Sequence, residues 1–452
     1  GTSSNAQREW AESRGWVVRQ FRMNWENATA LIARGVPFAF SQRHTTSAHM
    51  QALVGFDRTR GVFLVMDPGS PYRAERIADA LLEAMAPSGA MGIVFIPRSE
   101  AGRLDGLELT DAEKYDLRHE VLRALDSHDR GSAVTALQRM EQLWPDDSLT
   151  VMTRLSLAYY DTNDSETLFH IDSLLERYPR CPFLVYDRLL AMRNVTPEAR
   201  IRFLEEACDP LSGDPNLDVE LANLLLNDAA GFDRAGELLR RASRRLPTDS
   251  RVAVVMADLA WHRGKYPEAT DLYKYAATLE EFNEGLFKSW FQAARRSDRI
   301  DEALAFLEKR FARLGKRSAQ PAFTLVWALD ILDRDGRILP FLEEAMRLRP
   351  EDGSLMAEAA YYAQHAGRGD AAALLEKAKG RFRHNDWLRK AIRVSERRYD
   401  FHSVLAYAEE LLSIEPVSND AHVAKARALG NLKGDAAAVA HVVNDHHGEQ
   451  PG

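Results

Sequence analysis

The sequence predicts a mostly α-helical protein, an α-α superhelix of stacked helix pairs that is preceded by a small α/β domain. Three observations lead to this prediction. Prolines return at intervals of about 34 residues or multiples of that length, alanines return with the same period, and the first hundred residues show neither pattern. Repeats of this length are typical of solenoids, in which each repeat packs against its neighbours along the chain.

The recurring prolines mark helix ends. Proline cannot continue a helix, because it has no amide hydrogen and its ring collides with the preceding turn. All of these prolines except Pro215 follow a helix-like segment. We therefore expect residues 112–445 to form nine or ten antiparallel helix pairs wound into a right-handed superhelix. The recurring prolines are Pro145, Pro179, Pro215, Pro247, Pro350 and Pro416.

The recurring alanines are expected where helices touch. Their spacing is 12 and then 7 residues, and the same spacing returns 102 residues later, which is three times 34. Small side chains at these offsets allow two antiparallel helices to approach closely, so we predict that these alanines are buried. Gly264 and Gly367 fall in the expected turns between helices. The two sets are Ala257, Ala269 and Ala276, and Ala359, Ala371 and Ala378.

This pattern resembles the tetratricopeptide repeat (TPR) family, with its small residue in the first helix, two in the second and a terminal proline. The resemblance covers roughly residues 112–445 and implies a solenoid whose first helices line a concave groove for peptides or partner helices. The implied partner is therefore a protein or a peptide. The best match lies in one unit, at Ala257, Gly264, Tyr266, Ala269 and Ala276.

Aromatic residues on the first helices are candidates for lining such a groove. The alternative is that they pack between repeats, and we expect this of at least half of them. The candidates are Tyr159, Tyr160, Trp261, Trp290, Trp327, Tyr361 and Tyr362.

The first hundred residues predict a small α/β layer with a largely antiparallel sheet, because their apolar residues come in short runs. The segment 102–111 is the expected boundary, which gives a domain at residues 1–105 and the repeat solenoid at residues 106–452. The expected helices are 5–14, 27–33 and 73–86, and the expected strands are 17–22, 36–40, 49–56, 62–66 and 92–96.

Candidate chemistry lies in the hairpin formed by strands 49–56 and 62–66. If the turn is centred on Thr59, residues whose numbers sum to 118 face each other. His49 and Asp67 then lie on one face as diagonal neighbours, about 7–8 Å apart between backbones. A carboxylate at this range can bond one imidazole nitrogen and leave the other free to act as a general base.

This segment resembles the C39-like (papain-fold) cysteine peptidases. In that family a histidine opens a strand in a pattern like H-x-x-x-V-G-F-D, and an Asp or Asn ends the next strand before proline. Here His49 begins HMQALVGFD, Asp67 precedes Pro68, and Gly35-Val36-Pro37 matches the family's G-[IV]-P strand. The resemblance covers roughly residues 1–98 and implies that His49 and Asp67 occupy catalytic positions.

The nucleophile that the resemblance implies is missing from the matching segment. The family's cysteine opens a helix upstream of the matched residues, whereas this chain holds only Cys181 and Cys208. A histidine and a carboxylate cannot replace the thiolate. The chain begins at Gly1 without Met, so we expect either a cysteine on a missing N-terminal segment or a non-catalytic domain. As written, the chain is predicted to be inactive.

Two functions of different class therefore remain. One is an interaction scaffold that carries a peptidase-like domain, and the other is a cysteine peptidase whose repeats recruit the substrate. A net charge of −8 argues against a general nucleic-acid binder. No membrane span, metal site or cofactor is expected. The sequence leaves the oligomeric state and the compartment open, although the cytoplasm is slightly favoured, and its arginine- and alanine-rich composition is typical of GC-rich bacteria.

Other charged or reactive groups are expected to be structural. Asp161 to Ser165 resembles the start of a calcium loop, but a turn between helices is favoured. Cys181 is expected to be buried at a repeat junction, and His446-His447 to lie in a frayed tail. Two basic runs are expected to form solvated helix faces, with binding of an acidic peptide as the alternative. These runs are Arg240, Arg241, Arg244 and Arg245, and Lys309, Arg310, Arg313, Lys316 and Arg317.

Overall fold

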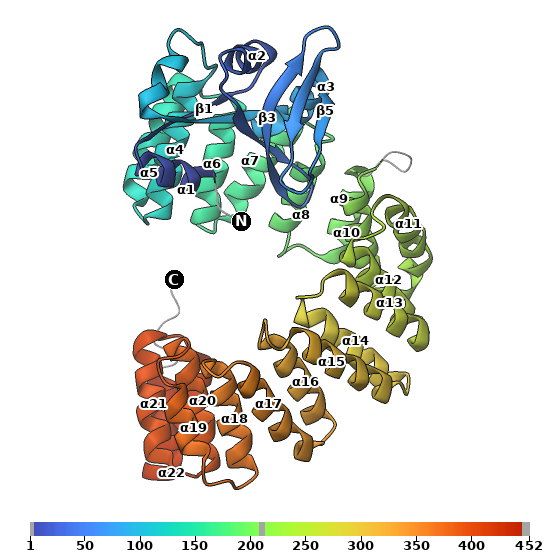
Figure 1. Ribbon diagram of the computed structural model, residues 1–452, viewed down its shortest axis with the longest axis vertical. Helices are drawn as coiled ribbons and strands as arrows, with labels where there is room; N and C mark the ends of the chain where they lie inside the picture. Colours follow the sequence, from blue (N-terminus) through green and yellow to red (C-terminus); the bar gives the residue numbers. More distant parts are fainter. Residues whose placement is uncertain (1–3, 208–212, 445–452) are drawn as a thin grey trace. The chain divides into compact units, whose positions relative to one another are not determined.

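The computed structural model describes residues 4–207 and 213–444. The chain divides into two compact units, Gly1–Pro247 and Thr248–Gly452. The first unit holds a sheet domain and four helix pairs, and the second holds six helix pairs (Figure 1). The last strand ends at Pro97 and the first repeat helix begins at Ala112. The domain boundary between residues 105 and 106 stays a prediction.

The N-terminal domain is built on a six-stranded antiparallel sheet with the order β1-β6-β2-β3-β4-β5. Its strands are β1 (Trp16–Arg22), β2 (Phe38–Arg43), β3 (Ala48–Asp57), β4 (Val62–Met66), β5 (Arg73–Ile77) and β6 (Met91–Pro97). Its helices are α1 (Ser4–Glu12), α2 (Trp25–Ala33) and α3 (Ala78–Met85), with short 3-10 turns η1 (Ala86–Ser88) and η2 (Arg98–Leu104).

Apolar clusters cover part of each face of the sheet. Leu53 of β3 and Phe63 of β4 lie in one apolar cluster with Leu31 of α2 and Leu81 of α3. On the other face, Val18 of β1 packs in a cluster with Ala11 of α1 and Ile93 of β6. The first repeat helix, α4, also contacts β1. The sheet is therefore a layer between α2 and α3 on one side and α1 and the first repeat on the other.

One predicted element of this domain is wrong. The helix expected at 73–86 begins only at Ala78, and Arg73–Ile77 forms the edge strand β5 against β4. Residues of β5 are mostly charged and exposed, so no apolar period distinguishes a strand from the first turns of a helix. Charged side chains on an edge strand also discourage pairing with other chains. The strand expected at 36–40 lies two to three residues later, at Phe38–Arg43.

The repeats of the described chain form ten helix pairs, within the predicted nine or ten. In the first unit the pairs are α4 (Ala112–Asp126) with α5 (Arg130–Leu143), α6 (Ser148–Tyr160) with α7 (Asp164–Arg177), α8 (Pro182–Ala191) with α9 (Pro197–Ala207), and α10 (Pro215–Leu225) with α11 (Phe232–Arg245). In the second unit they are α12 (Ser250–His262) with α13 (Tyr266–Leu279), α14 (Glu284–Arg296) with α15 (Ile300–Leu314), α16 (Gln320–Ile331) with α17 (Ile338–Leu348), α18 (Gly353–His365) with α19 (Ala371–Ala378), α20 (His384–Arg397) with α21 (Phe401–Ile414), and α22 (Asn419–Lys433) with α23 (Asp435–Asn444). Short 3-10 turns, η3 (Ala229–Gly231) and η4 (Asp335–Arg337), precede α11 and α17.

The prolines lie where they were expected, just after second helices. They also set the start of the next helix, because an aspartate two residues later often provides the N-cap. The Asp147 carboxylate, two residues after Pro145, accepts a hydrogen bond from the amide of Leu149, and Asp249 repeats this arrangement after Pro247. Such caps satisfy amide groups that have no partner within the helix. Pro215 differs because it lies in the first turn of α10.

The alanine prediction is confirmed. All six alanines are at most 2% exposed, and Ala269 and Ala276 are completely buried. Gly264 and Gly367 lie in the inter-helix turns with φ of +73° and +70°, a left-handed conformation that glycine adopts without strain. Asp161 likewise lies in a plain turn, between α6 and α7. None of the helices in the two described ranges is long and apolar enough to cross a bilayer.

Within the first unit, the sheet domain rests on the first helices of the repeats. Arg43, at the end of β2, pairs with Asp187 of α8 at 2.8 Å. Thr45 donates from its hydroxyl to the Asp214 carboxylate at the start of α10, at 2.9 Å. The phenol of Tyr115 in α4 donates to the carbonyl of residue 89 at 2.5 Å. The early first-helix face is therefore covered by this chain's own sheet domain.

The two basic runs were expected to form solvated helix faces, but this expectation is wrong for two of their arginines. Arg310 is only 3% exposed, pairs with Glu284 at 2.6 Å and lies over the ring of Phe287. Arg241 pairs with Asp218, whose side chain is fully buried. Both arginines lie on second helices and reach back to the first helix of their own pair, so they bind within the repeat.

Candidate functional site

His49 and Asp67 lie side by side at the open end of the β3–β4 hairpin. The imidazole Nε2 is 2.7 Å from Asp67 Oδ2. The side chain of His49 is 42% exposed and that of Asp67 is 25% exposed. The two side chains therefore share a face, as the strand alternation predicts, and solvent reaches both.

The hairpin register explains why the two residues meet. The predicted register holds at the open end, where Leu53 faces Val65. Nearer the turn the pairing shifts by one residue, so Gly55 faces Leu64. A β-bulge at Val54 accommodates the extra residue, and a one-residue shift exchanges the two faces of a strand. The prediction is thus correct at the site and wrong beside the turn.

Three hydrogen bonds hold the Asp67 carboxylate. The Gln51 side-chain amide donates to it at 2.5 Å, the Gly69 backbone amide at 2.7 Å, and His49 is its third partner. In this order of strength they lower the pKa of Asp67 to about 2. The carboxylate is therefore ionised at neutral pH and accepts a hydrogen bond from the Nε2–H group of His49.

This geometry leaves the other imidazole nitrogen, Nδ1, with its lone pair available. A histidine held in one tautomer by a carboxylate can take a proton from a neighbouring thiol, hydroxyl or water. Gln51 and Gly69 are the members of the site that the sequence prediction missed. Strand alternation could have identified Gln51. It lies two residues after His49, hence on the same face of the strand, and it is opposite Asp67 in the predicted register.

Cys181, the cysteine that lies within the described residues, is not suited to serve this pair as a nucleophile. Cys181 lies at the N-cap position of α8 and is buried, as expected. Burial raises the pKa of the Cys181 thiol, which keeps it protonated and unreactive. Cys208 and the His446-His447 pair lie outside the described residues.

The aromatic candidates divide into buried, partly buried and exposed groups. Trp290 is 1% exposed and Tyr362 is 8% exposed, so these two belong to the core and not to a groove. They fill the space between successive repeats, which a helix solenoid must close with large side chains. Tyr159 is 48% exposed. The remaining candidates, Tyr160, Trp261, Trp327 and Tyr361, are partly buried.

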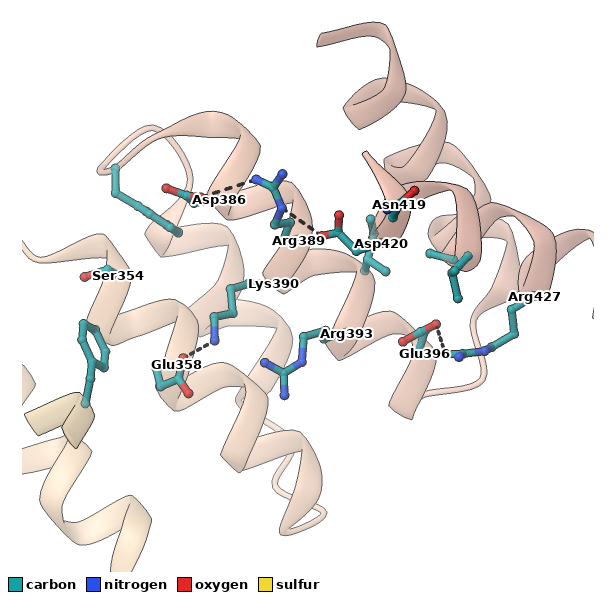
Figure 2. Close-up of a pocket in the computed structure, with 15 residues that line it drawn as sticks. Ser354, Glu358, Asp386, Arg389, Lys390, Arg393, Glu396, Asn419, Asp420 and Arg427 are labelled. Carbon is teal, nitrogen blue, oxygen red and sulfur yellow. Dashed lines mark hydrogen bonds and ion pairs between the residues drawn. The ribbon is translucent and has the colours of Figure 1, made fainter. Parts of the chain in front are cut away.

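A groove of about 830 Å³ lies along the first helices of the last repeats (Figure 2). Side chains of α18, α20 and α22 line most of it, and Phe323 and Phe382 contribute apolar surface. On α20 five of the six lining residues lie at positions 386, 389, 390, 393 and 396, a helical period that places them on one face. The residues predicted to line a groove are aromatic, whereas this groove is lined largely by charged residues.

Most of the charged side chains in the groove are paired with each other. Lys390 of α20 pairs with Glu358 of α18, and Arg427 of α22 pairs with Glu396 of α20. Arg389 pairs with Asp420 at 2.9 Å. These pairs connect three successive first helices, so the groove is held in one shape before any ligand binds.

Comparison with protein families decides the relationship of the N-terminal domain. Residues 2–86 match the model of the Peptidase_C39 like family. The domain is thus C39-like, and it precedes a TPR-like solenoid that makes up most of the chain. Comparison with curated proteins finds no match.

The chain is also similar to solved structures of helical repeat proteins. A tetratricopeptide repeat protein from Parabacteroides merdae is 13% identical, covers 59% of this chain and 98% of its own, and has a TM-score of 0.38. PilF of Pseudomonas aeruginosa is 17% identical over 47% of this chain and 97% of its own, with a TM-score of 0.28. Yeast Tom70 is 14% identical over 74% of this chain and 85% of its own, with a TM-score of 0.34.

Proposed function

We propose that this protein is an interaction scaffold whose last repeats bind an extended peptide or a partner helix. The observation that carries the proposal is the groove along α18, α20 and α22. The groove lies on first helices of the second unit. In the first unit, the equivalent first helices of the repeats hold the sheet domain. A volume of about 830 Å³ falls within the range of specific ligand sites, roughly 300–1,000 Å³.

The chemistry of the lining suits a peptide. Val423 on α22 is 55% exposed and offers an apolar contact for a side chain. The side-chain amide of Asn419 makes no hydrogen bond within the described chain, and an amide can both donate to and accept from a peptide backbone. A groove with apolar contacts and a few polar groups gives both affinity and orientation.

Binding of the full chain to an array of immobilised peptides tests this proposal. Val423→Asp places a charge in the groove and should abolish most of the binding. Val439→Asp is the matched control, because Val439 is 60% exposed on the second helix α23 and does not line the groove. If no peptide is bound, or if both variants lose binding equally, the scaffold proposal fails.

A second candidate function is cysteine-dependent peptide hydrolysis, and the His49–Asp67 pair is the observation that favours it. In that reaction His49 Nδ1 would take the proton from a thiol, and Asp67 would stabilise the imidazolium that forms. His49 and Asp67 supply this base and its orienting carboxylate, whereas the first cysteine of the sequence is Cys181, which is buried. We expect no hydrolysis of a quenched fluorescent casein substrate by this chain between pH 5 and 9. Hydrolysis that is lost in His49→Ala would favour the enzyme instead.

A further inference from the structure

We propose that the groove of the last repeats selects an acidic peptide, and that Arg393 of α20 binds its carboxylate. This inference rests on the proposed scaffold function and specifies the ligand of the same groove. It starts from a difference in charge pairing among the residues that line the groove.

Arg393 differs from the other charged residues of the groove. Within the described chain, every other charged lining residue has an ion-pair partner, whereas Arg393 has none. Figure 2 shows Arg393 between the Glu358–Lys390 and Glu396–Arg427 pairs, without an ion pair to either. Its guanidinium is therefore the cation of the groove lining that has no carboxylate partner within the described chain.

A neighbouring aromatic ring holds this guanidinium in place. Arg393 lies over the ring of Tyr361 in α18, with its central carbon 4.2 Å from the ring centroid. The hydroxyl of Tyr361 accepts a hydrogen bond from Arg397 at 2.9 Å, which fixes the tyrosine in turn. Stacking uses the flat face of the guanidinium and leaves its N–H groups at the edge free. Those N–H groups match the two oxygens of a carboxylate.

The surrounding charges favour one carboxylate over a nucleic acid. Glu358 and Glu396 flank Arg393, and Asp386 and Asp420 lie further along the groove. A nucleic-acid backbone would bring phosphates against these acidic groups, and its binding requires several basic contacts. Arg393 alone among the charged lining residues has no ion-pair partner in the described chain, so it suits one acidic side chain of a peptide. Val423 offers an apolar contact for a neighbouring side chain of the same peptide.

The test uses the full chain and ten-residue peptides with degenerate flanks. One position is fixed as Asp or Glu, as Asn or Gln in the matched amide peptide, or as phosphoserine. The best acidic peptide and its amide twin are then titrated by fluorescence anisotropy. Because a hydrogen-bonded charge pair contributes about 1.5–3 kcal/mol, we expect the acidic peptide to bind about tenfold to a hundredfold more tightly than its twin.

Variants assign this preference to Arg393. Arg393→Gln should lower affinity for the acidic peptide to that of the amide twin and leave the twin's affinity unchanged. Arg393→Lys should restore part of the preference. Arg398→Gln is the control, because Arg398 is exposed at the end of the same helix and does not line the groove. Melting curves show whether each variant is folded.

Three outcomes would overturn the inference. They are equal wild-type affinity for the acidic and amide peptides, equal loss of both in Arg393→Gln, and selection of phosphoserine without selection of Asp or Glu. Peptide binding without an acidic preference would still support the scaffold function. Absence of all peptide binding would instead reject the scaffold function itself.

Discussion

The first helices of the repeats are covered by the sheet domain in the first unit and form a groove in the second unit. In the first unit this face is covered by the sheet domain, and Arg43 of that domain supplies the cation that pairs with Asp187 of α8. In the second unit the groove charges pair among themselves, and Arg393 is left without a carboxylate. The first-helix face of the first unit therefore holds a domain of the same chain, because that domain supplies the arginine that pairs with Asp187.

The largest effect is expected at a buried ion pair of the covered face, between Arg43 and Asp187. Asp187 is 5% exposed, and burial raises the pKa of its carboxyl while Arg43 opposes that rise. Arg43→Ala leaves a buried carboxylate unpaired and should cost about 2–3 kcal/mol, less than a fully buried pair because Arg43 is 37% exposed. Hydrogen exchange should increase in α8 and stay unchanged in α20 and α22.

A second substitution tests the cause. Asp187→Asn in the Arg43→Ala background removes the buried charge, so it should recover part of the lost stability. The penalty of Arg43→Ala should also shrink as the pH falls, because burial raises the pKa of Asp187 and protonation neutralises the group. A penalty that is independent of pH and unaffected by Asp187→Asn would show that Arg43 acts through packing on Phe183, which its guanidinium overlies.

A smaller effect is expected from the alanine positions of the open unit. Ala269→Leu forces a larger side chain into a closed contact between helices and should cost about 1–3 kcal/mol. The control is Ala372→Leu, because Ala372 is exposed on a second helix and should change stability by about 0.5 kcal/mol or less. Urea denaturation followed by circular dichroism measures both. Equal effects of the two substitutions would contradict the assigned phase of the repeat.

The repeat region could be predicted because its signals are local and redundant. A proline follows the second helix of several pairs, an aspartate often caps the helix that comes next, and alanines mark the contacts. One degenerate unit therefore does not obscure the rest. The pair at α14 and α15 forms without a terminal proline, because its apolar face still packs into the core that its neighbours share. Burial of single aromatic residues depends on which helix lies opposite, and the sequence does not specify this for Trp290 or Tyr362.

Two features of the sheet domain could not be predicted from the local sequence pattern alone. The bulge at Val54 was missed, although the neighbouring glycine signals it, since a Cβ at Gly55 would lie 2.9 Å from the Leu64 side chain. Strand β5 was missed because a charged edge strand has no buried face to reveal its period. The pairing state of Arg393 depends on three helices, and no local pattern encodes it.

The covered face also differs from the open one in its response to acid. His119 of α4 is 7% exposed in the first unit, and burial lowers its pKa from 6.5 to about 4. The unfolded chain therefore binds a proton between pH 6.5 and 4 that the folded chain does not. His119 should thus reduce stability as the pH falls through this window. Between pH 7.5 and 4.5, the melting temperature of wild type should fall by a few degrees more than that of His119→Leu. Equal falls would place His119 in solvent.

The smallest change in stability is expected at the sheet's own site. His49 is 42% exposed, so His49→Ala should change the free energy of unfolding by about 0.5 kcal/mol or less. The informative measurement is the tautomer of His49, read from the nitrogen chemical shifts of its ring at pH 8. Asp67 accepts a hydrogen bond from Nε2, so Nε2 should carry the proton and Nδ1 should be unprotonated. Asp67→Ala should mix the two tautomers without unfolding the hairpin. A bare Nε2 in wild type would remove the general base from the hydrolytic candidate, whereas Arg393 and its groove would be unaffected.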